Sequence, residues 1–283
     1  MTRRKECFKL LCSLLFFCAV PMFAQSFSVL ADFASPQQGG NNLIQAADGN
    51  LYGTTIYGGP SDSGTVYRIT PAGAITTIYS FCSLASCADG AEPFFGLTLG
   101  ADGNLYGTTN QGGANNDGTV FKITLNGTLT TLHSFDGADG CTPQGGVMLA
   151  NNGVFYGTTL FCGAGAGTLF AIKPDGLFRT IYQFRSDSLH GGNLYTVPIQ
   201  ASDGNLYGVT YAGGSNGGPD GKLYGTVTSA ANCCGAVFRL TTSGTETVLY
   251  LFNGGETGPL RLLPSPLATM VLCIPPPRRA AQT

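Results

Sequence analysis

The feature that most constrains the fold is an eight-residue string that occurs four times, at intervals of 50 to 54 residues. The copies begin at Asp48, Asp102, Asn152 and Asp203, and the first two both read Asp-Gly-Asn-Leu-Tyr-Gly-Thr-Thr. A chain that repeats a segment at a fixed period repeats a structural unit. The sequence therefore indicates an array of equivalent units.

Each string is followed by two further segments that also recur. One is an alternating apolar run, such as Gly118-Thr119-Val120-Phe121-Lys122-Ile123, and the other ends in a phenylalanine: Phe81, Phe135, Phe184 or Phe252. A glycine-containing turn separates the two, and another apolar stretch precedes each string. Alternation of this kind indicates half-buried strands. Each repeat is thus predicted to contain four short strands, A to D.

The turn between strands A and B is predicted at the start of each string. Asp-Gly and Asn-Gly pairs are typical of two-residue hairpin turns with positive φ. The residues assigned to this turn and to strand B are Asp48, Gly49, Tyr52, Gly53, Asp102, Gly103, Tyr106, Gly107, Tyr156, Gly157, Asp203, Gly204, Tyr207 and Gly208.

Four antiparallel strands per repeat are typical of a β-propeller blade. We expect an all-β, β-propeller-like array of four complete blades within residues 25–258, at about 41–81, 95–135, 145–184 and 194–252. Residues 28–33 match only the last strand of a repeat, so they predict a lone D strand and an incomplete ring. A right-handed β-solenoid is the main alternative, although its coils are shorter and need no Asp-Gly hairpin.

Composition agrees with a turn-dense β protein. Glycine accounts for 42 of 283 residues without a Gly-X-Y period, which excludes collagen. A hydrophobic content of 43%, with 18 Phe and 12 Tyr, is too high for disorder. Charged residues make up only 11%, too few for long solvated helices.

The strings Asp-Gly-Asn-Leu-Tyr-Gly-Thr-Thr, Gly-Thr-Val-Phe-Lys-Ile-Thr and Thr-Thr-Leu-x-Ser-Phe resemble the Gloeo/Verruco tandem repeat over roughly residues 28–255. Proteins of that family are also called choice-of-anchor tandem repeat proteins. The resemblance implies secreted or surface-anchored bacterial proteins built of repeated β units. It brings no catalytic residues with it.

The first 24 residues are predicted to be a secretory signal. Arg3, Arg4 and Lys5 precede an apolar run over residues 10–20, and Ala24 offers a cleavage point. A retained membrane anchor is the alternative, but the run is shorter than the roughly 20 residues of a transmembrane helix. The mature chain would contain 10 bases and 15 acids, net −5. We therefore expect no nucleic-acid partner and no transmembrane span in the mature chain.

Cysteines are expected on one face of the array. In a four-stranded meander the D–A and B–C loops emerge at the same end, which we call the loop face. It would contain Cys82, Cys87, Cys141, Cys162, Cys233 and Cys234. An exported protein can form disulfides, and the favoured pairs are Cys82–Cys87 and then Cys141–Cys162. Zinc is the competing interpretation, but no second cysteine pair lies at metal-binding spacing.

The remaining polar residues predict no catalytic, cofactor-binding or metal site. His133 occupies a position held by tyrosine in the other repeats, so it is expected to pack as an aromatic ring. His190 is expected in a solvated loop. The mature chain has only Glu92, Glu246 and Glu256, far apart in sequence, whereas glycoside cleavage needs two carboxylates that converge.

The function predicted from these features is that of a non-catalytic secreted or cell-surface repeat protein. It would bind carbohydrate or another surface protein through the loop face, where loops tolerate variation. A propeller-type polysaccharide lyase or glycosidase is one alternative. A purely structural surface module is the other, supported by the uniformity of the repeats.

After Pro259 the repeat pattern stops, and residues 259–283 form an irregular tail with three consecutive prolines. A shifted reading frame of the codons for residues 269–283 is compatible with Asp-Gly-x-Leu-Tyr-x-Thr-Thr-x-x-Gly-Gly-Ala-Asn, which matches the second repeat from Asp102 to Asn115. A disordered terminus is the alternative. We expect a frameshift between Pro259 and Thr269, and the gene sequence would test it.

Overall fold

The protein folds into four four-stranded antiparallel sheets. The computed structural model describes residue 29 and residues 42–185, 191–210, 212–213 and 236–251. Within these residues the only helical element is a short 3₁₀ turn, η1 (Ala85–Cys87). No helix there is long and apolar enough to span a membrane.

Each sheet contains its strands in chain order, as a meander. The first two sheets consist of β1 (Ile44–Gln45), β2 (Leu51–Thr55), β3 (Thr65–Ile69) and β4 (Ile75–Ser80), then β5 (Thr98–Leu99), β6 (Leu105–Thr109), β7 (Thr119–Ile123) and β8 (Leu129–Ser134). The other two consist of β9 (Val147–Leu149), β10 (Phe155–Thr158), β11 (Gly165–Ile172) and β12 (Phe178–Arg185), then β14 (Ile199–Gln200), β15 (Leu206–Val209), β17 (Ala236–Leu240) and β18 (Glu246–Leu251).

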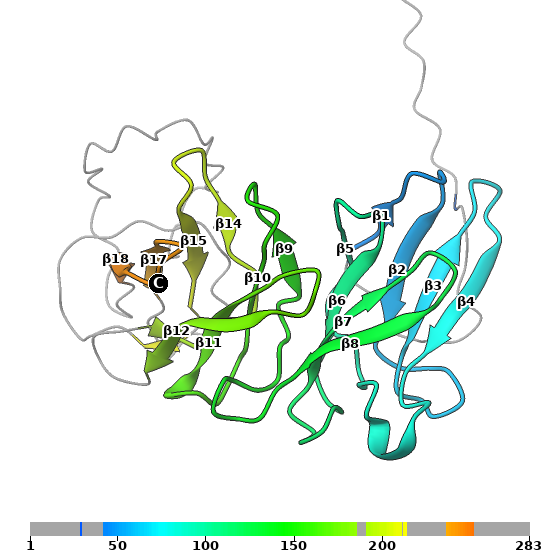
Figure 1. Ribbon diagram of the computed structural model, residues 1–283, viewed down its shortest axis with the longest axis horizontal. Helices are drawn as coiled ribbons and strands as arrows, with labels where there is room; N and C mark the ends of the chain where they lie inside the picture. Colours follow the sequence, from blue (N-terminus) through cyan, green and yellow to red (C-terminus); the bar gives the residue numbers. More distant parts are fainter. Residues whose placement is uncertain (1–28, 30–41, 186–190, 211, 214–235, 252–283) are drawn as a thin grey trace, which may run out of the picture.

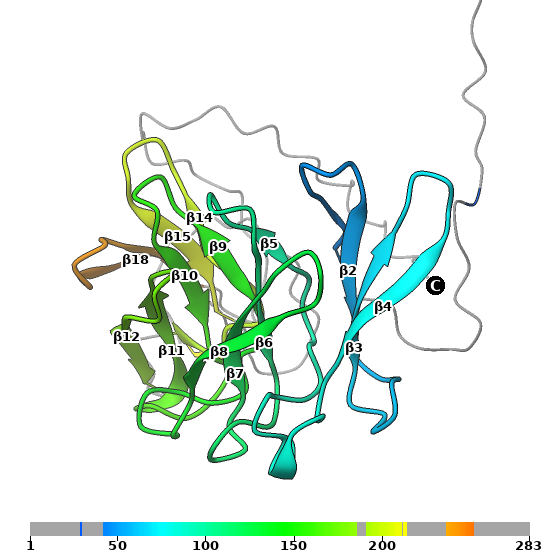
Figure 2. The same ribbon diagram turned by 45° about the vertical axis from the view of Figure 1, so that its right-hand side comes forward.

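The four sheets are equivalent blades. The string tyrosine pairs with the residue at one fixed place in the third strand each time: Tyr52 with Arg68, Tyr106 with Lys122, Tyr156 with Ala171 and Tyr207 with Arg239. The pairing of third and fourth strands shifts register at the same point in every blade. The blades follow one another around an open arc (Figures 1 and 2). The predicted β-propeller-like, incomplete array is therefore confirmed.

The A–B turn has a different form from the one predicted. Gly49 donates to the carbonyl of Ala46 at 3.0 Å, and Ala46 donates to that of Asn50 at 3.1 Å, which encloses a three-residue loop. Gly49 has a φ of 79°, whereas Asp48 is not among the positive-φ residues. This is the turn followed by a left-handed glycine that three-residue hairpins use. The prediction of a two-residue turn was wrong, but the requirement for glycine holds.

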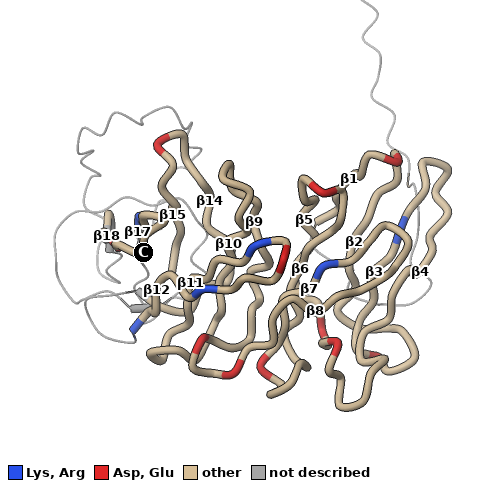
Figure 3. Tube along the Cα trace, viewed as in Figure 1, with Lys and Arg blue, Asp and Glu red and all other residues tan. Residues whose placement is uncertain are grey.

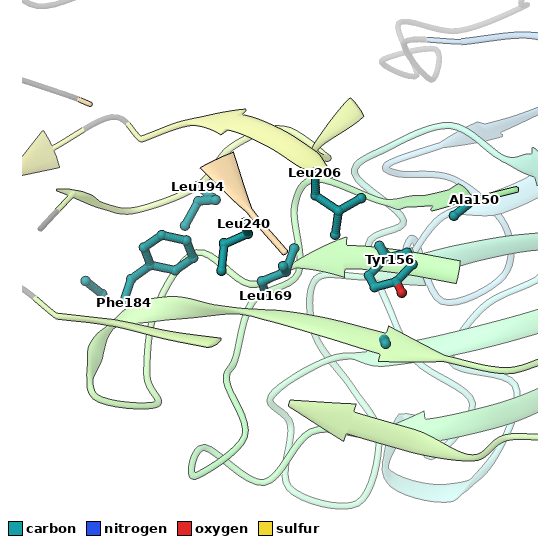
Figure 4. Close-up of a cluster of buried hydrophobic side chains, with 9 residues drawn as sticks. Ala150, Tyr156, Leu169, Phe184, Leu194, Leu206 and Leu240 are labelled. Carbon is teal, nitrogen blue, oxygen red and sulfur yellow. The ribbon is translucent and has the colours of Figure 1, made fainter. Parts of the chain in front are cut away.

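The hydrophobic core lies between blades. Rings on one side of a blade pack against the opposite side of the next, as Phe81 does with Phe121 and Phe135 with Phe170, at centroid distances of 5.1 and 5.3 Å. Figure 4 shows the interface between the third and fourth blades, formed by Ala150, Tyr156, Leu169, Phe184, Leu194, Leu206 and Leu240. Because each blade contacts mainly its neighbours, stability is expected to add up interface by interface.

The Tyr-Gly-Thr-Thr part of the string has a clear packing role. A Cβ on Gly107 would lie 2.6 Å from Phe121 Cζ, and one on Gly157 would lie 2.3 Å from Phe170 Cζ. Only glycine therefore leaves room for the aromatic ring on the paired strand.

The two threonines of the string make different contacts. The first donates to a carbonyl of the next blade: Thr54 to Phe95, Thr108 to Pro143 and Thr158 to Thr196, at 2.9–3.0 Å. The second bonds within its own blade, as in the 2.8 Å pair Thr109–Thr119. The first threonine thus links blades, and the second closes each one.

Several predictions concern residues outside the described part of the chain. These are the signal segment 1–24, most of the lone strand 28–33, and the tail 259–283.

Candidate functional site: the loop face

The loop face, at the lower side of Figure 1, is fixed by covalent bonds. Disulfides join Cys82 to Cys87 and Cys141 to Cys162, the two pairs that the sequence favoured. The first closes the D–A loop after β4, and the second joins a D–A loop to the next B–C loop. Cys233 and Cys234 lie outside the described residues.

Backbone pairing also connects the loops of neighbouring blades. Ala91 forms a bridge with Gln111, and Cys141 forms one with Phe161. At the third junction the pairing extends to two short strands, β13 (Gly191–Gly192) and β16 (Ala212–Gly213). Each D–A loop is thereby held against the B–C loop of the blade that follows it.

A buried aspartate organises the first D–A loop. Asp89 is fully buried and accepts hydrogen bonds from the Tyr79 hydroxyl at 2.8 Å, the Ser83 amide at 2.9 Å and the Leu84 amide at 3.1 Å. Burial would raise the pKa of Asp89, but these hydrogen bonds outweigh it and lower the pKa below its usual value. The loop is therefore shaped around an ionised carboxylate.

The second D–A loop uses histidine in place of tyrosine. His133 Nε2 lies 2.7 Å from Asp139 Oδ2, and the imidazole stacks on Phe178 at a centroid distance of 3.6 Å. It also contacts Phe135 edge to face, at 5.0 Å. His133 thus packs as an aromatic ring, as expected, and also binds a loop carboxylate that the sequence analysis did not assign to it.

One position repeats along the loop face, two residues after the second string threonine. Tyr57 occupies it in the first blade, Gln111 in the second and Phe161 in the third. The Tyr57 and Phe161 side chains are 43% and 45% exposed, and Gln111 is also exposed. Large aromatic side chains are more often buried. Because the blades are equivalent, the three residues form a row along the arc, which we call the loop-face row.

The centre of this row is polar. Gln111 Nε2 donates to Glu92 Oε2 at 2.9 Å, and the Asn110 amide donates to the Glu92 carbonyl at 2.9 Å. Among the described residues, Asn110 Oδ1 is buried without a hydrogen-bond partner. In the other three copies the Asn110 position is occupied by Ile56, Leu160 and Tyr211, so the amide at this position is particular to the second blade.

Glu92 is also held in an uncommon conformation. Its φ is 56°, and the equivalent residues Thr142 and Asn193 both have a φ of 57°. Glu92 donates its amide to the Ser63 carbonyl at 2.8 Å and Thr142 to the Asp117 carbonyl at 2.9 Å, both in the preceding B–C loop, and Asn193 donates to the Ala166 carbonyl at the start of β11 at 2.8 Å. Left-handed backbone at residues other than glycine is uncommon and concentrates at functional sites. The strain here recurs at one equivalent point of each blade junction.

Sequence comparison places the chain in a family. The model of the Gloeobacter/Verrucomicrobia repeat matches residues 19–219. The chain belongs to this family. No curated protein matches the sequence significantly. Among solved structures, one described as a "putative gluconolactonase" is 16% identical, with a TM-score of 0.45, and the match covers 78% of this chain and 66% of that one. The chain thus spans less than two thirds of that structure's length.

In each blade, the A–B turn that contains the string aspartate lies at the end opposite the loop face. Asp102 Oδ2 accepts hydrogen bonds from Asn104 Nδ2 and the Tyr106 hydroxyl, both at 2.7 Å, and the first and fourth copies make the same contacts. Figure 3 shows acidic residues gathered at the turns and loops. The aspartate, asparagine and tyrosine of each of these strings therefore contact one another, and their role is structural.

The residues that sequence reasoning missed are Asp89, Asp139, Glu92 and the Asn110–Gln111 pair. A signal for the aspartates exists, because Ala-Asp-Gly-x-x-Pro occurs at residues 88–93 and again at 138–143. For Asn110 the signal is an amide side chain where the other copies have Ile, Leu or Tyr. The described residues contain no group of three or more His, Cys, Asp or Glu side chains placed to bind a metal ion.

Proposed function

We propose that this chain is an exported, non-catalytic repeat protein that binds carbohydrate through the loop-face row. The observation that carries the proposal is the row itself, in which exposed Tyr57 and Phe161 flank the polar centre of Glu92, Asn110 and Gln111. Exposed apolar groups that lie next to polar ones mark interaction sites when they gather in one place.

The chemistry of this row fits a saccharide. A sugar ring has an apolar C–H face that packs on aromatic rings, and hydroxyl groups that donate to carboxylate and amide oxygens. A buried acceptor without a partner costs about 1–3 kcal/mol. The Asn110 residue is partly exposed, and a rotation of its side chain that brings Oδ1 to a ligand hydroxyl would remove that cost.

Two features support export. The first is the charged and apolar pattern of residues 1–24, which is typical of a secretory signal. The second is the presence of two disulfides, which persist in oxidising compartments. N-terminal sequencing of the protein recovered from the culture medium or cell surface tests this part, with mature protein expected to begin after Ala24.

A glycan array probed with the oxidised protein tests the binding. We expect a restricted set of glycans to bind, and Tyr57→Ala and Phe161→Ala each to weaken binding about tenfold, or about 1.4 kcal/mol. Leu177→Ala is the matched control, because Leu177 is 62% exposed in a C–D turn at the opposite end.

Other results would contradict the proposal. Binding that is unchanged in both aromatic variants would place the site elsewhere. No binding to any glycan would favour a purely structural module, and cleavage of a bound polysaccharide would favour an enzyme.

A further inference from the structure

Every internal blade interface has two different sides. On the outgoing side of the first blade, Ile44 of the first strand and Ile78 of the fourth strand pack in one cluster with the string tyrosine Tyr52. Met148 and Ile181 do the same with Tyr156 in the third blade, whereas in the second blade Leu132 packs with Tyr106 and the first-strand position is Thr98. On the incoming side, the following blade contributes an apolar residue at the start of its first strand. This residue is Leu97, directly before β5, in the second blade and Val147, the first residue of β9, in the third. The two sides fit each other at successive junctions.

The fourth blade exposes its outgoing side. Ile199, which pairs with Tyr207 as Ile44 pairs with Tyr52, is 54% exposed. Leu249, the equivalent of Ile78, is 44% exposed. Tyr207 itself is partly exposed, whereas the string tyrosines of the other three blades are 0–3% exposed.

The first blade exposes part of its incoming side. Leu43 is 49% exposed, whereas the equivalent Leu97 and Val147 are 6% and 3% exposed. The described part of the array therefore has an apolar outgoing surface on the fourth blade and an exposed apolar incoming residue on the first. These are the two halves of a contact that the chain already makes internally.

We propose that a second copy of this chain docks head to tail, with the outgoing side of its fourth blade against the incoming side of the first blade. The proposal rests on similarity to the internal interfaces, because the two end surfaces are equivalent to surfaces that already pack against each other between successive blades. A contact between two different surfaces is heterologous and produces rings or open chains of subunits. Val209 replaces the first string threonine in the fourth blade, so this junction lacks one hydrogen bond that internal junctions have.

The mass of the oxidised full chain, measured by light scattering over a range of concentrations, tests the proposal. We expect a mass of two or more copies at high concentration. The double variant Ile199→Asp/Leu249→Asp and the single variant Leu43→Asp are each expected to be monomeric, while Leu177→Asp keeps the wild-type mass. All four positions are exposed, and circular dichroism together with intact disulfides verifies that each variant is folded.

Mixing the two end variants makes the test specific. Each retains one intact end, so the mixture should form a heterodimer although neither variant associates alone. A wild-type chain that is monomeric at every concentration would overturn the proposal. An assembly that survives Leu43→Asp would also overturn it, because that result indicates contact between two copies of the same end.

Discussion

Replacing Tyr106 by phenylalanine should destabilise the protein through a single hydrogen bond. The Tyr106 hydroxyl donates to Asp102 at 2.7 Å, and its ring stacks on Phe155 at a centroid distance of 4.0 Å. Phenylalanine retains the stacking and removes only the hydroxyl. Hydrogen bonds to charged groups contribute about 1.5–3 kcal/mol, but Asp102 is exposed and solvent screens its charge. We therefore expect a loss of about 1–2 kcal/mol.

Thermal unfolding followed by circular dichroism measures this loss. For a protein of this size, 1 kcal/mol corresponds to about 2–4 °C, so a decrease in Tm of about 3–6 °C is expected. The matched control is Tyr156→Phe in the third blade, where Asn152 replaces the aspartate and its Nδ2 lies 3.3 Å from the tyrosine hydroxyl. This longer, uncharged contact should contribute about 0.5 kcal/mol or less.

The loss should also depend on pH. Burial would raise the pKa of Asp102, but the hydrogen bonds from Asn104 and Tyr106 outweigh it and lower the pKa. A lowered pKa in the folded state adds stability above the unfolded value of about 3.9, and this stability is lost as the pH falls through the folded pKa. The Tm difference between wild type and Tyr106→Phe should thus be larger at pH 7 than at pH 3.

Two results would refute this reasoning. Equal losses in Tyr106→Phe and Tyr156→Phe would show that the carboxylate adds nothing to the contact. A Tm difference that stays constant from pH 7 to pH 3 would show that ionisation of Asp102 is irrelevant to it.

Three further substitutions test other parts of the fold. Gly107→Ala should cost about 1–3 kcal/mol by overpacking against Phe121, and a lower urea midpoint would show it. Cys162→Ser opens a disulfide between residues 21 apart in sequence and should cost about 3 kcal/mol under oxidising conditions, with no difference from wild type after reduction. Thr108→Val removes a hydrogen bond to the next blade and should cost about 1–3 kcal/mol, with faster amide hydrogen exchange at that junction as the readout.

The blades could be predicted from the sequence because their determinants are local. Alternation in segments such as residues 118–123 and a glycine in each turn fix the strands within one repeat. The form of the A–B turn could not be predicted in the same way. Two- and three-residue hairpins both use Asp-Gly, and the choice depends on which residues pair across the turn, here Ala46 with Asn50.

The candidate site was less predictable, because it forms where loops of different blades meet. Cys141 and Cys162 indicated one such contact between loops, because a disulfide between two cysteines can be proposed from the sequence alone. Glu92 and Gln111 lie 19 residues apart, and nothing in the sequence indicates that their side chains form a hydrogen bond. The backbone pairing of Ala91 with Gln111, between loops of neighbouring blades, brings them together.

The two adjacent string threonines have a consequence for inheritance of the gene. The first bonds forward to the next blade and the second bonds within its own, so the boundary between two structural contacts lies inside a stretch whose amino-acid sequence recurs from repeat to repeat. Recombination between any two copies of that stretch, in frame, would leave the second strand whole and would rejoin matching sides of neighbouring blades. Unequal crossing-over could then lengthen or shorten the gene by whole repeats while every resulting chain retained compatible junctions.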